Sequence, residues 1–339
     1  ILASISSQLS KSPFNYIIKR KKEEDMKLVI QIPCYNEEKS LPITLNDLPK
    51  HIDGIDEIEV LIIDDGSKDR TVEVAKELGV NNFVEMSHNS GLAKAFVAGI
   101  NKALEIGADI VVNTDADNQY CAADIEKLVK PILAGEADIV IGSRPVSEIE
   151  HFSPLKKLLQ KLGSGVMRLI SSTKVEDAPS GFRAFSRNAA MQLNVFDNYT
   201  YTLETIIQAK AKGLILKCVP IRVNPDLRKS KLVRNMFDYI RRSVFTMIRM
   251  FIIYRPFRFF AILAGMFFLV GALIGLRFLY YFVFESGAGH IQSLILSAIL
   301  IITGVQVGVI AVLSELLSIN RKILEDIQKR LKLQDLQKK

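Results

Sequence analysis

Two long apolar stretches towards the C-terminal end place the tightest constraint on how this chain can fold. Phe259–Leu276 contains no charged residue and predicts a helix that continues to about Phe284, and Ile291–Leu313 is a second charge-free run. At 1.5 Å per residue, each helix is long enough to cross about 30 Å of hydrocarbon. Because the link Glu285–His290 is short, we expect a hairpin of two transmembrane helices within residues 257–319.

The charges that flank this hairpin predict its orientation. Arg255 and Arg258 precede it, and Arg321 and Lys322 follow it. Cytoplasmic loops carry an excess of Lys and Arg, so both ends of the hairpin are expected in the cytosol, together with the preceding domain and both termini. The charged tail over 320–339 predicts a solvated helix, and pairing with another chain into a homo-oligomer is the alternative.

The positive charge of the chain is concentrated in one segment. The formal net charge is +7, whereas Arg228–Arg258 alone carries nine Arg or Lys against one acid, Asp238. Because this segment directly precedes the hairpin, residues 228–256 predict a basic amphipathic region that lies on anionic membrane lipids. A surface helix of the globular domain is the alternative. Nucleic acid is not an expected partner, because the basic segment adjoins membrane helices.

The N-terminal residues and the cysteines add little to the assignment. Residues 1–26 are polar and basic, without the apolar core of a signal peptide, and are expected to be an N-terminal extension. Met26 directly precedes the first convincing strand and is a candidate natural start. Three widely separated cysteines predict reduced packing residues rather than a metal site. They are Cys34, Cys121 and Cys218.

Short apolar runs alternate with helical patterns over residues 27–227. The runs are Leu28–Ile32, Val60–Ile63, Ile110–Val112 and Ile139–Ile141. The helical patterns fall near 40–49, 69–79, 91–106 and 122–134. Continuously apolar runs suit strands that are buried on both faces of a parallel sheet. The alternation therefore predicts a three-layer α/β domain that binds its ligands beyond the carboxyl ends of the strands.

Three oxygen-bearing side chains follow the run Ile110–Val112. Asp115, Asp117 and Gln119 are spaced two residues apart, so on an extended segment they point the same way. Hard divalent cations take oxygen ligands, and Mg²⁺ typically binds one or two carboxylates plus substrate phosphates. The pattern predicts a Mg²⁺ or Mn²⁺ site that neutralises the charge on a departing nucleotide diphosphate.

A second polar motif, Asp64-Asp65-Gly66-Ser67, ends the run Val60–Ile63. Gly66 permits a sharp turn, and Ser67 or Asp69 can cap the helix that follows. Adjacent carboxylates at a strand end can bind the base and ribose of a nucleotide. A simple turn between strand and helix, with capping residues, is the alternative.

Together with Ile32-Pro-Cys-Tyr-Asn-Glu-Glu38, these motifs resemble the inverting family 2 glycosyltransferases of GT-A fold in both order and spacing. Further matches lie at His88–Gly91, Ile141–Arg144, Asp177–Phe185 and Lys229–Leu232. The last two are similar to the Thr-Ser-Gly-Phe-Arg and Ser-Lys-Leu segments of dolichol- and polyprenyl-phosphate sugar synthases. The resemblance covers roughly residues 27–235, and the two-helix anchor is similar to that of bacterial polyprenyl-phosphate glucosyltransferases.

The resemblance implies a role for each matching residue. The nucleotide-sugar would contact Pro33, Tyr35, Glu37, Asp65, Asp115, Ser180 and Gly181. The metal and diphosphate would be held by Asp115, Asp117 and Gln119, and phosphate or acceptor groups would meet Arg144, Arg228 and Lys231. Catalysis would depend on Asp115, Asp117, Arg144 and Lys231. Surface salt bridging is the alternative for Arg228, and Asn118 and Tyr120 depart from the common Leu and His, so donor identity does not transfer.

The function implied by this resemblance is cell-envelope glycosylation. One hexose would pass from a nucleotide-sugar of UDP-glucose or GDP-mannose type to a polyprenyl phosphate, with inversion. A phosphate with a second pKa of about 6 needs no base, whereas a hydroxyl acceptor would need a carboxylate such as Asp177 or Glu204. The alternatives are transfer to another membrane glycolipid or diacylglycerol, and a catalytically silent nucleotide-sugar-binding protein. A polymer-extruding synthase is disfavoured, because such enzymes usually carry Gln-x-x-Arg-Trp and this chain has no Trp.

Overall fold

The computed structural model describes residues 25–145, 175, 177–195, 201–225, 241, 244–245, 248–249, 251–284 and 290–337. The chain divides into two compact units, one ending at Leu232 and the other beginning at Val233. The predictions made for Arg228, Lys231 and most of the basic region fall outside the described residues, as do those for residues 1–24.

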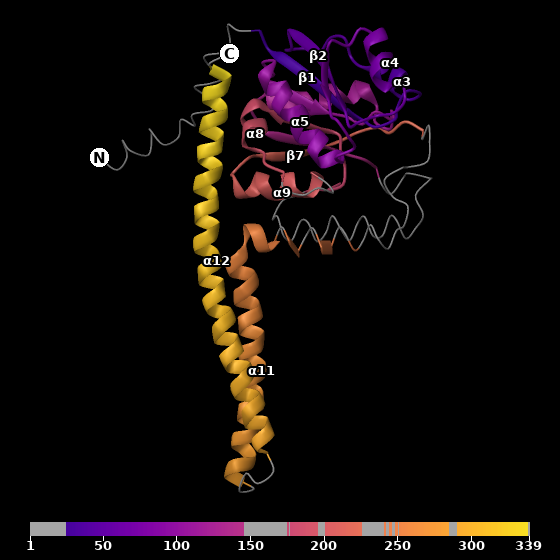
Figure 1. Cartoon of the computed structure of the whole chain (residues 1–339). Coiled ribbons are helices and arrows are strands. Elements are labelled where there is room, and N and C mark those ends of the chain that lie inside the picture. The colour runs from indigo at the N-terminus through magenta and orange to yellow at the C-terminus, as the bar shows by residue number, and fades with distance from the viewer. Residues whose placement is uncertain are drawn as a thin grey trace, which may run out of the picture. The chain divides into compact units, whose positions relative to one another are not determined.

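A seven-stranded mixed sheet forms the centre of the first unit (Figure 1). Its strands are β1 (Lys27–Cys34), β2 (Glu57–Asp64), β3 (Asn82–Glu85), β4 (Ile110–Asn113), β5 (Ile139–Ser143), β6 (Arg183–Ser186) and β7 (Leu216–Pro220). In space they lie in the order β3-β2-β1-β4-β6-β5-β7. The described pairings are parallel except for those of β6, which runs antiparallel to both β4 and β5.

The four strands expected from the sequence are confirmed as β1, β2, β4 and β5, and all four run in the same direction, as expected. The antiparallel strand β6 was not expected. The antiparallel strand β6 arises from the Gly-Phe-Arg-Ala-Phe segment, where Arg183 interrupts the apolar pattern that marks the other buried strands. Its side chain is nevertheless fully buried. The two edge strands β3 and β7 also lacked a signal, because each mixes polar with apolar residues and is only partly buried.

Helices cover both faces of the sheet, so the three-layer prediction is confirmed (Figure 1). One face carries α3 (Leu41–Asp47), α4 (Thr71–Glu77), the 3-10 turn η1 (Ala122–Asp124) and α6 (Ile125–Leu133). The other carries α5 (Leu92–Glu105), α8 (Arg187–Gln192) and α9 (Thr202–Ala211). Alternate residues of β1 divide between the layers: Ile30 joins the core with Leu41, whereas Gln31 packs against Gly99 of α5.

The second unit contains two long helices, α11 (Pro256–Phe284) and α12 (Ile291–Gln337). Both are long and apolar enough to cross a membrane, with a mean hydropathy of 2.5 each over their most apolar windows. No break separates the second apolar run from the charged tail, because α12 continues as one helix of 47 residues. At 1.5 Å per residue it measures about 70 Å, more than twice the thickness of a hydrocarbon core.

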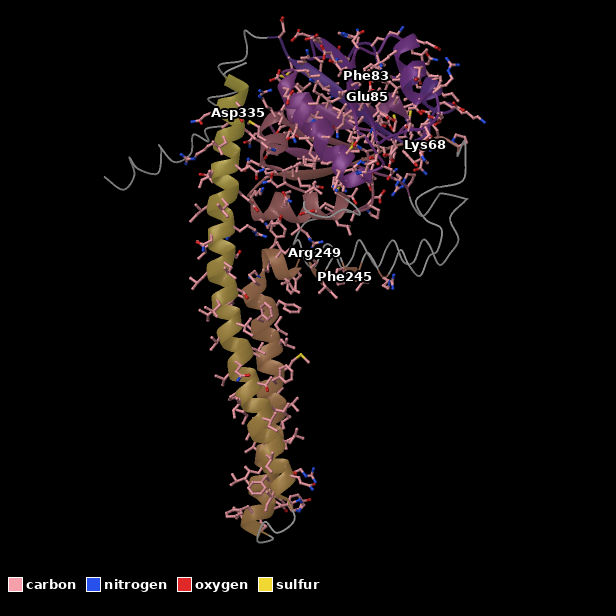
Figure 2. All side chains as sticks on the ribbon, in the orientation of Figure 1. Lys68, Phe83, Glu85, Phe245, Arg249 and Asp335 are labelled. Carbon is pink, nitrogen blue, oxygen red and sulfur yellow. The ribbon has the colours of Figure 1, made fainter. Side chains whose placement is uncertain are left out.

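Small residues bring α11 and α12 into close contact. A Cβ added to Gly271 would lie 2.9 Å from Cγ1 of Ile301, and the Ser297 hydroxyl donates to the Gly271 carbonyl at 2.7 Å. Close approach at small residues and interhelical hydrogen bonds are typical of helix pairs in lipid. Carbon dominates the outward side chains along this pair (Figure 2), and only 6% and 17% of the two apolar windows are buried. Such a surface requires an apolar environment.

Candidate active site

The polar motifs of the first unit meet at one edge of the sheet. In the parallel register, Cys34 at the end of β1 pairs with Asp64 at the end of β2. Gln31 of β1 pairs with Asn113, the last residue of β4. The loops that follow these three strands therefore leave the sheet at the same edge, where ligands of open α/β sheets bind.

Hydrogen bonds fasten the loop after β1 to the loop after β2. The Asn36 amide donates to the Ser67 hydroxyl at 2.9 Å, and the Lys68 amide donates back to Oδ1 of Asn36 at 2.8 Å. The Glu37 amide donates to Oγ1 of Thr71 at 2.9 Å, and the buried Glu37 carboxylate accepts from the Ser40 hydroxyl at 2.5 Å. Pro33, the penultimate residue of β1, is half-buried, and Tyr35 directly after the strand is 36% exposed.

Asp65 binds a third loop. Its two carboxylate oxygens accept from the amides of Ser90 and Gly91, at 2.7 and 2.9 Å, directly before α5. Gly66 is required beside it, because its φ is +72° and a Cβ there would lie 2.7 Å from the backbone of His88. The described contacts of Asp65 therefore join the loop after β2 to the loop that leads into α5.

Asp115 lies partly buried next to a second carboxylate. Burial raises the pKa of Asp115 to about 7, the charge of Asp117 adds to the rise, and Arg144 and a hydrogen bond from the Tyr120 hydroxyl oppose it. Asp117 accepts from the Gln119 amide at 3.2 Å, which fixes a tight turn. A bound cation would stabilise the anionic form of a carboxyl such as Asp115, whose protonated form is favoured in its absence.

The residues at this turn fit a divalent cation that is shared with a substrate. Asp115, Asp117 and Gln119 are hard oxygen donors, as Mg²⁺ and Mn²⁺ require. Within the described part of the chain, no group of three or more His, Cys, Asp or Glu is arranged to hold a metal. The protein thus offers an incomplete oxygen set, which suits an ion whose other ligands are diphosphate oxygens and water.

A buried ion pair lies beside these carboxylates. Nε of Arg144 donates to Oδ2 of Asp177 at 2.7 Å, and Nη2 donates to Oδ1 at 3.1 Å. The two side chains are only 9% and 1% exposed. Asp115 and Tyr120 lie within electrostatic range and, with Asp177, help to hold the pKa of Arg144 above its usual value against the effect of burial. The pair holds the Arg144 guanidinium in a fixed position next to the carboxylates, and Asp177 balances its charge.

The structure brings the Ser180–Gly181 segment to Asp115. A Cβ on Gly181 would lie 3.2 Å from Oδ1 of Asp115 and 3.1 Å from the Tyr201 hydroxyl, so a glycine fits best there. The Gly181 amide donates to the Tyr120 hydroxyl at 3.1 Å, and its carbonyl accepts from Asn113 at 3.0 Å. Ser180 is fully buried, and among the described residues its hydroxyl has no hydrogen-bond partner.

Arg183 holds this segment in place through hydrogen bonds, and no role was predicted for it from the sequence. Its guanidinium donates to backbone carbonyls on both sides of the site, and it is fully buried. The accepting carbonyls are those of Ala178, Ser180 and Thr202, at 2.7, 2.8 and 2.8 Å. Burial lowers the pKa of Arg183 to about 10. A charged residue inside the otherwise apolar run Gly-Phe-Arg-Ala-Phe could have indicated a buried, hydrogen-bonded arginine.

The segment that follows β7 is fastened to the loop after β4. The Asn224 amide donates to the Gln119 carbonyl at 2.8 Å, and Tyr120 and Val223 form an antiparallel bridge. Arg222 donates to both carboxylate oxygens of Asp124. The chain that leads to Arg228 and Lys231 thus begins at the carboxylate turn, although those two residues themselves lie outside the described part.

Comparison with known proteins agrees with this arrangement. Residues 29–193 match the model of glycosyl transferase family 2. The UDP-N-acetylglucosamine–dolichyl-phosphate N-acetylglucosaminyltransferase of Methanococcus voltae is 35% identical over 58% of this chain and 86% of its own length. The undecaprenyl-phosphate mannosyltransferase of Micrococcus luteus is 30% identical over 61% of this chain and 88% of its own length.

Solved structures share the fold. Glucosyl-3-phosphoglycerate synthase from Mycobacterium tuberculosis, solved with Mn²⁺, UDP-glucose and phosphoglyceric acid, superposes with a TM-score of 0.54. The match covers 70% of this chain and 83% of that one at 19% identity, so it identifies the fold alone. The mixed sheet, the carboxylate turn and the sequence relatives agree: this chain belongs to glycosyl transferase family 2 and is a glycosyltransferase of GT-A fold.

Proposed function

We propose that the enzyme transfers one sugar of the hexose class from a UDP- or GDP-linked donor to a polyprenyl phosphate, with inversion at the anomeric carbon. It would do so at the cytosolic face of a cell membrane and would require Mg²⁺ or Mn²⁺. The observation that carries the proposal is the position of Asp115, beside Gly181 and within the field of the Arg144–Asp177 pair.

On the donor side, Asp115, Asp117 and Gln119 would hold the metal. Such an ion, when bound, neutralises the charge that develops on the departing diphosphate. Arg144 adds a fixed positive charge that needs no reorganisation, because Asp177 already holds its guanidinium. The backbone at Ser180 and Gly181 would border the sugar, and the Pro33–Glu37 loop would border the nucleotide.

The state of the two candidate bases favours a phosphate acceptor over a hydroxyl. Asp177 accepts three hydrogen bonds from Arg144, so its carboxylate oxygens are already engaged and do not face an acceptor hydroxyl alone. Glu204 is fully buried within α9, where it accepts from Gln208 at 3.3 Å. A phosphate monoester is already largely ionised at neutral pH and can attack without a base. Catalysis would then depend on positioning and electrostatics.

Chain connectivity supports the phosphate-binding roles proposed for the basic residues after β7. Asn224 is hydrogen-bonded to the carboxylate turn. Arg228 follows it by four residues and Lys231 by seven, so their Cα atoms can lie at most about 14 and about 25 Å from that of Asn224. The length of the connecting chain therefore permits both residues to approach a phosphate at the site.

The helix pair supports a lipid acceptor. Its apolar side chains face outward and need hydrocarbon around them. An enzyme anchored in this way meets its polyprenyl phosphate in two dimensions, with the phosphate at the interface. The basic residues Arg255, Arg258, Arg321 and Lys322 flank the apolar runs, and they would favour both an anionic surface and cytosolic ends.

A donor panel tests the proposal. Purified full-length protein is incubated with Mg²⁺ or Mn²⁺, a short polyprenyl phosphate and, in turn, UDP-glucose, UDP-N-acetylglucosamine and GDP-mannose, and the lipid product is detected by mass. We expect one productive donor. Asp117→Asn should abolish turnover, whereas Asp53→Asn, which removes an exposed carboxylate, should not.

The same assay separates the alternatives. A product on diacylglycerol or a glycolipid, but none on polyprenyl phosphate, would replace the proposed acceptor. Binding of a nucleotide-sugar without turnover on any acceptor would favour a catalytically silent protein. Full activity of a folded Asp117→Asn variant would contradict the metal assignment.

A further inference from the structure

Tyr120 occupies the centre of the site, although nothing in the motif assigns it a role. It follows Gln119 directly, its side chain is 4% exposed, and its ring stacks on that of Phe182 with centroids 5.0 Å apart and planes 8° from parallel. Its backbone pairs with Val223. The ring stack and the backbone pairing together fix the position of its hydroxyl.

That hydroxyl makes both of its hydrogen bonds to residues of the site. It accepts from the Gly181 amide at 3.1 Å and donates to the Asp115 carboxylate. A tyrosine hydroxyl is protonated at neutral pH and can donate one hydrogen bond while it accepts another. Successive bonds from amide to hydroxyl to carboxylate polarise one another and strengthen.

We propose that Tyr120 is the positioning residue for Asp115: it fixes the carboxylate for the metal and sets its distance from the sugar-bordering Gly181. The inference rests on the proposed metal role of Asp115 and extends it to a residue that touches neither metal nor donor. Phe at this position would keep the stack on Phe182 and lose only the bond that orients Asp115.

Tyr201 provides a matched comparison. It is equally buried, stacks on Phe96 at 3.9 Å and bonds to the same glycine. Its hydroxyl, however, donates to the Gly181 carbonyl at 3.2 Å and accepts from Asn113 at 2.8 Å. Tyr201→Phe therefore removes a buried hydroxyl from the same segment without removing the hydrogen bond to Asp115.

The test measures Mn²⁺ binding to full-length wild type, Tyr120→Phe and Tyr201→Phe by loss of the free-Mn²⁺ EPR signal. The Mn²⁺ signal is recorded with UDP and, separately, with GDP, and each signal is compared with that of the same mixture without protein. Loss of a hydrogen bond that orients a metal ligand typically weakens metal affinity by about 10- to 100-fold. We expect a loss in that range for Tyr120→Phe and less than about twofold for Tyr201→Phe. Turnover of Tyr120→Phe should recover at saturating Mn²⁺, which a loss of folded protein would not allow.

Each other result has a distinct meaning. Mn²⁺ affinity of Tyr120→Phe within about twofold of wild type would overturn the inference and leave the proposed metal site intact. Equal weakening in both variants would also overturn it, because the effect would then belong to the packing around Gly181. If wild type retained Mn²⁺ with neither nucleotide, the proposed metal site would fail and the role of Tyr120 with it.

Discussion

Gly181→Ala tests whether the spacing between the Gly181 backbone and the Asp115 carboxylate controls activity. The added Cβ would lie 3.2 and 3.4 Å from the two Asp115 carboxylate oxygens and 3.1 Å from the Tyr201 hydroxyl, so these groups must move by a few tenths of an ångström. A misplacement of about 1 Å in an active site can cost about 100-fold in rate. If the activation free energy rises in proportion to displacement, a shift of about 0.3 Å reduces kcat/KM about fourfold.

The assay is the kcat/KM for the productive donor at saturating metal and acceptor, with thermal unfolding measured in parallel. Overpacking of this kind typically costs about 1–3 kcal/mol of stability. Gly54→Ala is the stability control: its φ is +84° and its Cβ would lie 3.2 Å from Leu133, so the alanine is strained in a turn before β2. Full activity of Gly181→Ala, or an equal loss in Gly54→Ala, would refute the argument from Asp115.

Three further predictions concern the ion pair, the carboxylate turn and the helix pair. Asp177→Asn should cost about 3–5 kcal/mol in unfolding experiments, because it leaves the Arg144 guanidinium buried without its carboxylate; an unchanged melting temperature would contradict this. In EDTA, Asp115 keeps its proton up to about pH 7 in the native state, whereas in the unfolded chain it loses the proton above its ordinary pKa of 3.8. The protonated carboxyl therefore stabilises the native state at low pH, and this stabilisation is lost as the pH rises through about 7. Asp115→Asn should therefore flatten the fall in melting temperature between about pH 5 and pH 8, and an unchanged slope would refute the shift. Gly271→Leu should lower the melting temperature in detergent more than Gly265→Leu, because only the former would add a side chain against α12.

The sequence predicted those parts of the fold that have a local signal. β1, β2, β4 and β5 are short apolar runs, and the helices between them carry matching patterns. The insertion of β6 between β4 and β5 could not be predicted in this way, because its partners are distant in sequence and Arg183 breaks its apolar pattern. The environment that buries Arg183 consists of carbonyls from three separate positions, which become neighbours only in the folded chain.

The candidate site shows the same division. Asp115, Asp117 and Gln119 could be identified because ligand chemistry and spacing lie within five residues. The pairing of Arg144 with Asp177 spans 33 residues, and the bond from Asn224 to Gln119 joins residues 105 positions apart in the chain. Residue types alone therefore left Asp177 open as a base, whereas the folded chain commits its carboxylate to Arg144.

The reversed direction of β6 explains how this fold delivers a loop to its active edge. Asn113, the last residue of β4, pairs with Arg183, the first residue of β6. The segment before β6, which contains Asp177 and Gly181, consequently leaves the sheet at the edge where the parallel strands end. A parallel strand in the same place would present its following residues there instead and carry this segment to the opposite edge. The antiparallel strand, for which the sequence carried no signal, is thus what puts Gly181 beside Asp115 and Asp177 beside Arg144.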